Sequence, residues 1–259
     1  MFARILASIA AALPSSLKYK LNWAKAIYTL AMSLGQHVME VRTVAGTLYW
    51  EIDKLTSQQH ILATYEPYMQ RAFLKWVHSG SVVYDIGAHV SFHSLFCGLL
   101  VGSSGRVFAF EPGPEARASL MRQVAVNPGI PVTVLPYAIS DRSGTAWLDT
   151  SRGSSQCFIS DRGSIAVEAR TIDALVMEGL PAPDVMKIDV EGHEKAVING
   201  ALDTLRTNNV IVLVDWNDAT TLDTVRELLS PLGYSISEGP PIIVLPRVLP
   251  RWRETNEAR

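Results

Sequence analysis

The chain has 259 residues, 48% of them hydrophobic, which is enough for one α/β domain with a sizeable core and an N-terminal extension. Its formal net charge of −2 excludes the broad basic surface of typical nucleic-acid-binding proteins. The two cysteines, Cys97 and Cys157, match neither a metal-ligand spacing nor a disulfide framework. We therefore expect a cytoplasmic protein with a buried Cys97 thiol.

The N-terminal segment is basic and apolar, with no acidic residue before Glu40. Residues 1–13 carry an apolar face at helical spacing, but this run is too short to span a bilayer. A signal or transit peptide, a weakly membrane-associating helix and a helix that packs on the domain are the three alternatives. We expect residues 1–60 to form a helical extension with a short hairpin at 41–50, and residues 61–259 to form the main domain.

Two apolar runs stand out because each ends at a carboxylate. Residues 82–86 lead to a turn at Gly87, with Asp85 near the end of the run, and residues 107–110 lead to Glu111. Such β-branched and aromatic runs are typical of buried strands in a parallel sheet. The intervening residues 91–102 predict a helix, so the unit is β-α-β with a ligand crevice at the carboxyl ends of the strands.

The first turn favours a nucleoside cofactor without phosphates. It contains one glycine, Gly87, whereas a dinucleotide site needs the G-x-G-x-x-G pattern. Glu111 follows roughly twenty residues later, where a carboxylate can accept hydrogen bonds from both ribose hydroxyls. S-adenosylmethionine is the predicted ligand, with its aminoacyl end along the turn.

Further strands are predicted at 132–135, 184–189 and 210–214, and helices at 68–78 and 221–229. The Gly/Ser-rich stretch 140–163 predicts a hairpin and loop that project over the crevice. The last two runs, 234–237 and 242–245, predict an antiparallel hairpin that closes the sheet.

At this point the sequence resembles the FkbM-type S-adenosylmethionine-dependent methyltransferases over roughly residues 60 to 216. The resemblance is carried by Asp85-Ile86-Gly87-Ala88, Glu111-Pro112, Tyr137-Ala138-Ile139-Ser140-Asp141, Thr171-Ile172-Asp173 and Lys187-Ile188-Asp189-Val190-Glu191-Gly192-His193-Glu194, with Tyr65-Glu66-Pro67 and Gly200-Ala201-Leu202 at matching places. It implies an α/β class I methyltransferase fold, Rossmann-like, with a mostly parallel seven-stranded sheet. It also implies O-methylation of a small molecule or glycan.

The cofactor-binding residues that follow from the turn and the resemblance are Asp85, Gly87, Ala88, His89, Ser91, Glu111, Pro112, Ala138, Ile139 and Asp189. The chain departs from the family pattern at His89 and Ser91, where Asn and Gly are usual. If position 91 needs a positive φ, serine costs roughly 1 kcal/mol or more. Its hydroxyl is expected either to contact the cofactor or to cap the following helix.

Methyl transfer to an alcohol needs a base within hydrogen-bonding reach of the acceptor. Asp189, at the end of the fourth strand, points into the same crevice as Asp85 in the expected strand order. The candidate catalytic residues are Asp189, Glu191 and His193, with the base left open among them. Asp215, Asn217 and Asp218 with Asp189 offer oxygen ligands for Mg²⁺, but an acidic helix start explains them better, and no metal is expected.

We therefore predict a methyltransferase that acts on a hydroxyl of a small molecule or saccharide. One alternative is a non-catalytic, methyltransferase-like scaffold that has lost tight cofactor binding through His89 and Ser91. The other is a nicotinamide-dependent oxidoreductase, which the missing glycines disfavour.

Overall fold

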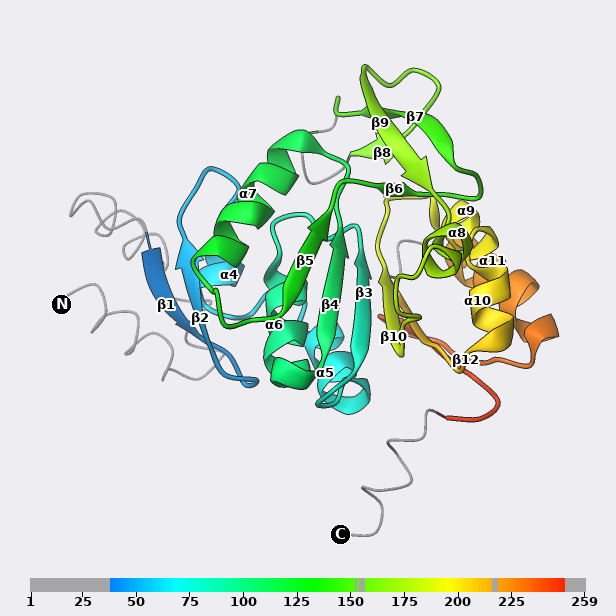
Figure 1. The fold of residues 1–259 in the computed structure, drawn as a ribbon, viewed down its shortest axis with the longest axis horizontal. Coiled ribbons are helices and arrows are strands. Elements are labelled where there is room, and N and C mark those ends of the chain that lie inside the picture. Colours follow the sequence, from blue (N-terminus) through cyan, green and yellow to red (C-terminus); the bar gives the residue numbers. More distant parts are fainter. Residues whose placement is uncertain (1–37, 152, 154–156, 216–218, 250–259) are drawn as a thin grey trace, which may run out of the picture.

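The computed structural model describes residues 38–151, 153, 157–215 and 219–249, so the helices predicted within residues 1–37 lie outside the described part. A seven-stranded sheet of order β12-β13-β11-β10-β3-β4-β5 forms the centre (Figure 1). Its strands are β3 (Val82–Ile86), β4 (Arg106–Phe110), β5 (Val132–Leu135), β10 (Val185–Ile188), β11 (Ile211–Val214), β12 (Ser235–Ser237) and β13 (Ile242–Leu245). Only β13 runs antiparallel to its neighbours, β11 and β12. The predicted class I methyltransferase sheet and its closing hairpin are confirmed.

The central strands are buried on both faces, as their continuous apolar sequences require. Every residue of β10 and of β11 is buried. Because β3, β4, β10 and β11 are parallel, their carboxyl ends meet at one edge of the sheet. The residues that follow each strand, including Gly87 and Glu111, therefore gather at that edge.

Helices cover both faces of the sheet. One face carries α5 (Pro67–Trp76), α6 (Phe92–Val101) and α7 (Pro114–Ala125), and Cys97 is buried there as predicted. The opposite face carries α8 (Ile172–Met177), α9 (Glu194–Asn199), α10 (Leu202–Thr207) and α11 (Ala219–Leu229). The short 3-10 helices η1 (Gly102–Ser104) and η3 (Ser230–Leu232) follow α6 and α11. The predicted helices at 68–78, 91–102 and 221–229 are confirmed within a few residues.

The predicted N-terminal hairpin consists of β1 (Val38–Arg42) and β2 (Thr47–Glu51), followed by α4 (Gln58–Ile61). Two side chains, one in α7 and one just after it, hydrogen-bond to the backbone of β2 as a neighbouring strand would. Asn127, just after α7, accepts from the Tyr49 N–H at 2.8 Å, and Gln123 accepts from the Glu51 N–H at 2.8 Å. Both amides also donate to the carbonyls of the same two residues. The hairpin thus shares one hydrophobic core with α5 and α6, to which Trp50 contributes.

The hairpin predicted within residues 140–163 is present, and it belongs to a second sheet between β5 and β10. This sheet has four strands in the order β6-β9-β7-β8: β6 (Ala138–Ile139), β7 (Gly144–Asp149), β8 (Phe158–Ile159) and β9 (Ile165–Arg170). This small sheet lies above the carboxyl ends of the main strands in Figure 1. The sequence analysis missed β9 because its apolar and polar residues do not alternate strictly, since the apolar Ala166 is at an exposed position.

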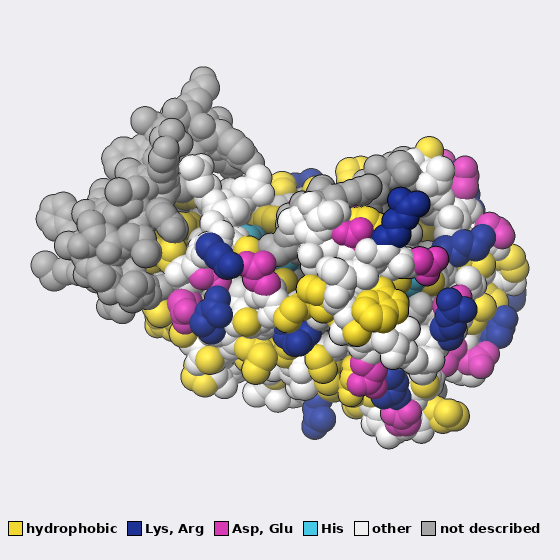
Figure 2. Space-filling view, turned by 90° about the horizontal axis from the view of Figure 1, so that it is seen from above, with side chains coloured by type: hydrophobic (Ala, Val, Ile, Leu, Met, Phe, Trp, Pro, Cys, Tyr) yellow, Lys and Arg dark blue, Asp and Glu magenta, His cyan; other side chains and the backbone are white. Residues whose placement is uncertain are grey.

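Figure 2 looks onto this upper side of the molecule and shows acidic and basic side chains interspersed over the described residues. Among the residues the structure describes, no helix is long and apolar enough to cross a membrane.

Candidate active site

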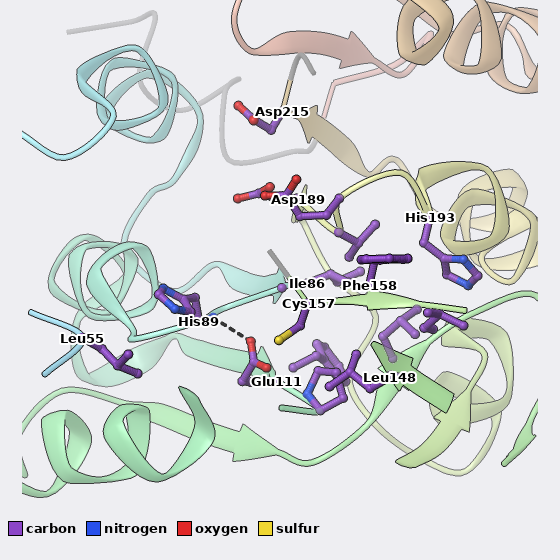
Figure 3. A pocket seen from close by; sticks show the side chains of 18 of the residues that line it. Leu55, Ile86, His89, Glu111, Leu148, Cys157, Phe158, Asp189, His193 and Asp215 are labelled. Carbon is purple, nitrogen blue, oxygen red and sulfur yellow. Dashed lines mark hydrogen bonds between the residues drawn. The ribbon is translucent and has the colours of Figure 1, made fainter. Parts of the chain in front are cut away.

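A cavity of about 390 Å³ opens at the carboxyl edge of the sheet, within the range of about 300–1,000 Å³ that is common for small-molecule sites. It brings together most of the predicted site residues: Gly87, His89, Glu111, Pro112, Ala138, Ile139, Asp189, Glu191 and His193. Figure 3 shows Glu111 and Leu148 on one side of the cavity and Asp189 and Asp215 on the other. Asp85, Ala88 and Ser91 do not line it.

The first turn has a backbone that favours glycine at three positions. Gly87 has φ +79°, and a Cβ there would lie 1.9 Å from the Asp189 carbonyl oxygen, so another residue would force the two strand ends apart. His89 and Ser91 have φ of 47° and 84°. Both departures from the family pattern therefore occupy left-handed conformations, each of which costs roughly 1–2 kcal/mol for a residue with a side chain.

Ser91 precedes α6, but its hydroxyl does not cap the helix. Its Oγ is buried and has no hydrogen-bond partner among the described residues. The capping alternative is thus wrong, because the left-handed backbone turns the side chain away from the free N–H groups of the first turn. Ser91 lies beneath the turn, and its role in cofactor binding stays a prediction.

Glu111 is held by the backbone of two turns. Its Oε2 accepts from the His89 N–H at 2.8 Å, and its Oε1 accepts from the Gly113 N–H at 2.7 Å. Burial raises the pKa of Glu111 to about 7, although these two donors act to lower it. Each carboxylate oxygen keeps a second lone pair. The carboxylate is therefore oriented for two more donors, which fits the predicted ribose hydroxyls.

The wall beside Glu111 is mostly apolar. Ala138 and Ile139 of β6 meet Leu148 of β7 and Phe158 of β8 there, so the small sheet covers this end of the cavity. These apolar side chains can pack against an adenine ring. An adenosine-containing ligand thus fits the residues on this side.

Lys187 links two of the predicted acidic residues in a buried pair of ion contacts. Its Nζ lies 3.1 Å from Asp85 Oδ1 and 3.2 Å from Asp189 Oδ2, and it donates to the Gly87 carbonyl at 2.9 Å. Burial opposes the charge on Lys187, but the surrounding carboxylates outweigh it and hold its pKa well above the usual value. Lys187 therefore remains an ammonium ion at the bottom of the site.

The expectation that Asp85 and Asp189 point into the same crevice is wrong. Asp85 is opposite Lys187 in the register of β3 and β10, two residues below Asp189. It is 1% exposed and accepts from Ser94 at 2.6 Å. Burial raises the pKa of Asp85, but Lys187, His93 and Ser94 outweigh it, so the net shift is downward. Asp85 supports Lys187 from below, while Asp189 reaches the cavity.

The three base candidates occupy different places. Asp189 faces the cavity and pairs with Lys187. Glu191 is exposed in a left-handed turn with φ 53°. His193 hydrogen-bonds through Nε2 to Ser140 Oγ at 2.9 Å, and burial lowers its pKa. Figure 3 places His193 away from Asp189 and Asp215, so the candidates do not form one cluster.

Sequence reasoning missed Glu66, which lines the cavity at the Asp189 end. It adjoins α5, and its φ of 39° is left-handed. Burial raises the pKa of Glu66 to about 7, helped by Asp189 and Asp215 and opposed by Lys187. The only signal was its place in Tyr65-Glu66-Pro67, because it does not follow a predicted strand.

Asp215 lies at the cavity rim after β11, where its Oδ1 accepts from the Tyr68 hydroxyl at 2.9 Å. Asn217 and Asp218, the other residues of the magnesium hypothesis, lie outside the described part of the chain, as does Trp216. Within the described residues, no group of three or more His, Cys, Asp or Glu side chains is placed to hold a metal ion.

Comparison with known proteins identifies the group to which this site belongs. Residues 85–236 match the FkbM methyltransferase domain. Hexuronic acid methyltransferase AglP of Haloferax volcanii is 30% identical over 183 residues, which are 67% of this chain and 70% of AglP.

Solved structures show a partial likeness. The FkbM methyltransferase of Methylobacillus flagellatus aligns with a TM-score of 0.46 at 16% identity, over 74% of this chain and 56% of its own. An S-adenosylmethionine-dependent O-methyltransferase of Thermotoga maritima aligns with a TM-score of 0.48 at 16% identity, over 82% of this chain and 78% of its own. The match to a methyltransferase domain and the similarity to a methyltransferase contradict the oxidoreductase alternative. S-adenosylmethionine is the methyl donor. The chain belongs to the FkbM family of S-adenosylmethionine-dependent methyltransferases.

Proposed function

We propose that the protein O-methylates a hydroxyl of a small molecule or saccharide. The sulfonium of S-adenosylmethionine supplies an electrophilic methyl group, so the protein must align an acceptor oxygen and remove its proton. The observation that carries the proposal is the contrast between the two sides of the cavity. Glu111 and an apolar wall lie on one side, and acidic side chains lie on the other.

In this proposal the methyl donor lies along the turn after β3, with its ribose at Glu111 and its adenine beside Ala138 and Ile139. His89 and Pro112 border the same part of the cavity. The acceptor then binds beside Asp189, whose carboxylate can accept a hydrogen bond from a hydroxyl. The sequence offered Asp189, Glu191 and His193 as catalytic candidates and left the base open among them.

A saccharide acceptor is supported by the relative AglP, whose name specifies a hexuronic acid. A hexuronic acid offers both hydroxyl groups and a carboxylate. The acidic side chains favour a neutral hydroxyl over a carboxylate acceptor, because like charges within a shared site repel. A hydroxyl yields a methyl ether, whereas a carboxylate yields a methyl ester.

The test is transfer of a labelled methyl group to p-nitrophenyl glucoside and to p-nitrophenyl glucuronide, followed by mild alkali. We expect label that survives alkali, as an ether does, with the glucoside accepted at least as well as the glucuronide. Label released by alkali from the glucuronide alone would contradict hydroxyl methylation. A calorimetric titration with S-adenosylmethionine completes the test, because the scaffold alternative predicts no heat of binding.

A further inference from the structure

Glu66 has a geometry that the proposed function leaves unused. It lines the cavity, but it belongs to the segment before α5 and not to any strand end. Other polar residues of the same segment, Ser57, Gln59, His60 and Tyr65, line the cavity with it. The segment therefore forms a polar wall that an acceptor rich in hydroxyl groups can contact.

The imidazole of His93 lies behind Glu66, and its Nε2 atom can accept a hydrogen bond. His93 Nε2 is 3.6 Å from Glu66 Oε2, and both atoms are buried without a hydrogen-bond partner among the described residues. His93 is 4% exposed and packs against the rings of Tyr65 and Phe73. Burial lowers the pKa of His93 to about 3, so the ring stays neutral at working pH.

Protonation of Glu66 would satisfy both atoms at once. A carboxylic acid can donate through its O–H, and a neutral imidazole nitrogen without a proton can accept. The gap of 3.6 Å is slightly longer than a hydrogen bond and closes with a small side-chain shift. The pair is thus better satisfied after Glu66 has gained a proton than before.

The candidates from the sequence are less suited to receive the proton. Asp189 already pairs with the Lys187 ammonium ion, so its carboxylate is engaged. His193 is hydrogen-bonded to the Ser140 hydroxyl and lies away from Asp189 and Asp215 in Figure 3. Glu191 is exposed, so water competes for its lone pairs.

Building on the proposed function, we infer that Glu66 binds the acceptor hydroxyl and takes its proton, with His93 as the positioning residue behind it. The acceptor oxygen forms a bond to the methyl carbon, the carbon–sulfur bond breaks, and sulfur keeps the electron pair. The proton from the hydroxyl moves to Glu66 Oε1, because the buried Oε2 faces His93. A half-turn of the carboxyl group about Cγ–Cδ then lets this O–H donate to His93 Nε2. Asp189 then binds a neighbouring acceptor hydroxyl and does not act as the base.

The titration of Glu66 sets the expected pH dependence. The titratable and charged groups that face it are Tyr65, Tyr68, His93, Lys187, Asp189 and Asp215. With the pKa of Glu66 raised to about 7 by burial, the base form increases as pH rises through that value. Activity should therefore rise towards pH 7 and level off above it.

The decisive variant is Glu66→Gln, which keeps the shape of the side chain and removes the base. We expect kcat for a hydroxyl acceptor to fall by about 10²–10⁴-fold, the rise with pH to disappear, and the affinity for S-adenosylmethionine to stay the same. Glu178→Gln is the matched control, because Glu178 pairs with Arg170 outside the cavity. It should change none of the three quantities.

A second variant and a spectroscopic measurement do not depend on the size of the activity loss. His93→Phe retains a ring but removes Nε2, so the acid form of Glu66 loses its acceptor and the activity rise should move to lower pH. Infrared difference spectra across pH 7 should contain protonated-carboxyl bands from Glu66 and Glu111, whose pKa values are both raised to about 7, and Glu66→Gln should lose the Glu66 band and keep that of Glu111.

Ether formation by the wild type together with an unimpaired Glu66→Gln variant would overturn the assignment of Glu66 alone. So would an unchanged infrared spectrum in that variant. An alkali-labile product from the wild type would instead overturn the proposed hydroxyl acceptor. The two failures are therefore distinguishable.

Discussion

Glu111 and Glu66 are two buried carboxylates on the wall of one cavity, and burial raises the pKa of each to about 7. Their surroundings differ. Glu111 accepts two backbone N–H groups, one on each oxygen, whereas Glu66 has one oxygen without any donor, facing His93. Glu66 also has a hydrogen bond with the Tyr65 side chain. A carboxylate with a donor on each oxygen is suited to hold a ligand, and one with a donor-free oxygen is suited to gain a proton. Similar pKa values therefore accompany different surroundings, and we propose different roles for the two residues.

The largest effect on stability is expected from substitution of Lys187, the buried cation of the site. Lys187→Met leaves Asp85 buried without its ion partner, so the free energy of unfolding should fall by about 3–5 kcal/mol. Chemical denaturation measures this loss. Lys195→Met, at an exposed ion pair, is the control and should change stability little. Equal stability of the two variants would show that the buried network does not hold the site together.

Glu111→Gln tests the ligand-holding role. The amide retains one acceptor oxygen but loses the charge and one acceptor, so S-adenosylmethionine should bind more weakly by about 1–3 kcal/mol, roughly 5–150-fold in Kd. Calorimetric titration measures this, with Glu178→Gln as the control. Unchanged affinity would remove Glu111 from the cofactor site and with it the contrast to Glu66.

The pH dependence of the free energy of unfolding tests whether the pKa of Glu66 is raised in the folded protein. Its folded-state pKa of about 7 is above the ordinary value of 4.5, so the folded protein binds this proton more tightly. The resulting stabilisation is complete below pH 4.5 and is lost as pH rises through 7. Glu66→Gln removes this dependence. At pH 8 the free energy of unfolding of the variant should therefore exceed that of the wild type by about 1–2 kcal/mol, and at pH 4.5 this difference should be absent. Thermal unfolding of both proteins at pH 4.5 and pH 8 measures this difference. An equal difference between the two proteins at both pH values would contradict a raised pKa of Glu66.

Ser91→Gly sharpens the description of the cofactor turn. Glycine relieves the left-handed strain and removes a buried hydroxyl without a partner, so the free energy of unfolding should rise by about 1 kcal/mol. Ser230→Gly, in a 3-10 helix, should instead lower it by about 0.5–1 kcal/mol. A loss of S-adenosylmethionine affinity in Ser91→Gly would assign its hydroxyl to the cofactor.

Much of the fold could be predicted because its signals are local. Continuous apolar runs gave β3, β4, β10 and β11, and a carboxylate at a strand end sufficed to place Glu111 and Asp189 at the cavity. The six-residue strand β9 was missed because its apolar and polar residues do not alternate strictly.

The positions of the central strands, the turn at Gly87 and the carboxylate Glu111 at a strand end could be predicted from the sequence alone, because each depends on residues that are neighbours along the chain. The depth of Asp85 was decided only in the tertiary structure, where the register of β3 and β10 sets it opposite Lys187. The approach of Glu66 to His93, from a segment outside the main sheet, was likewise decided there. Contacts between distant segments depend on how helices pack on the sheet, and no local pattern of residues records that packing.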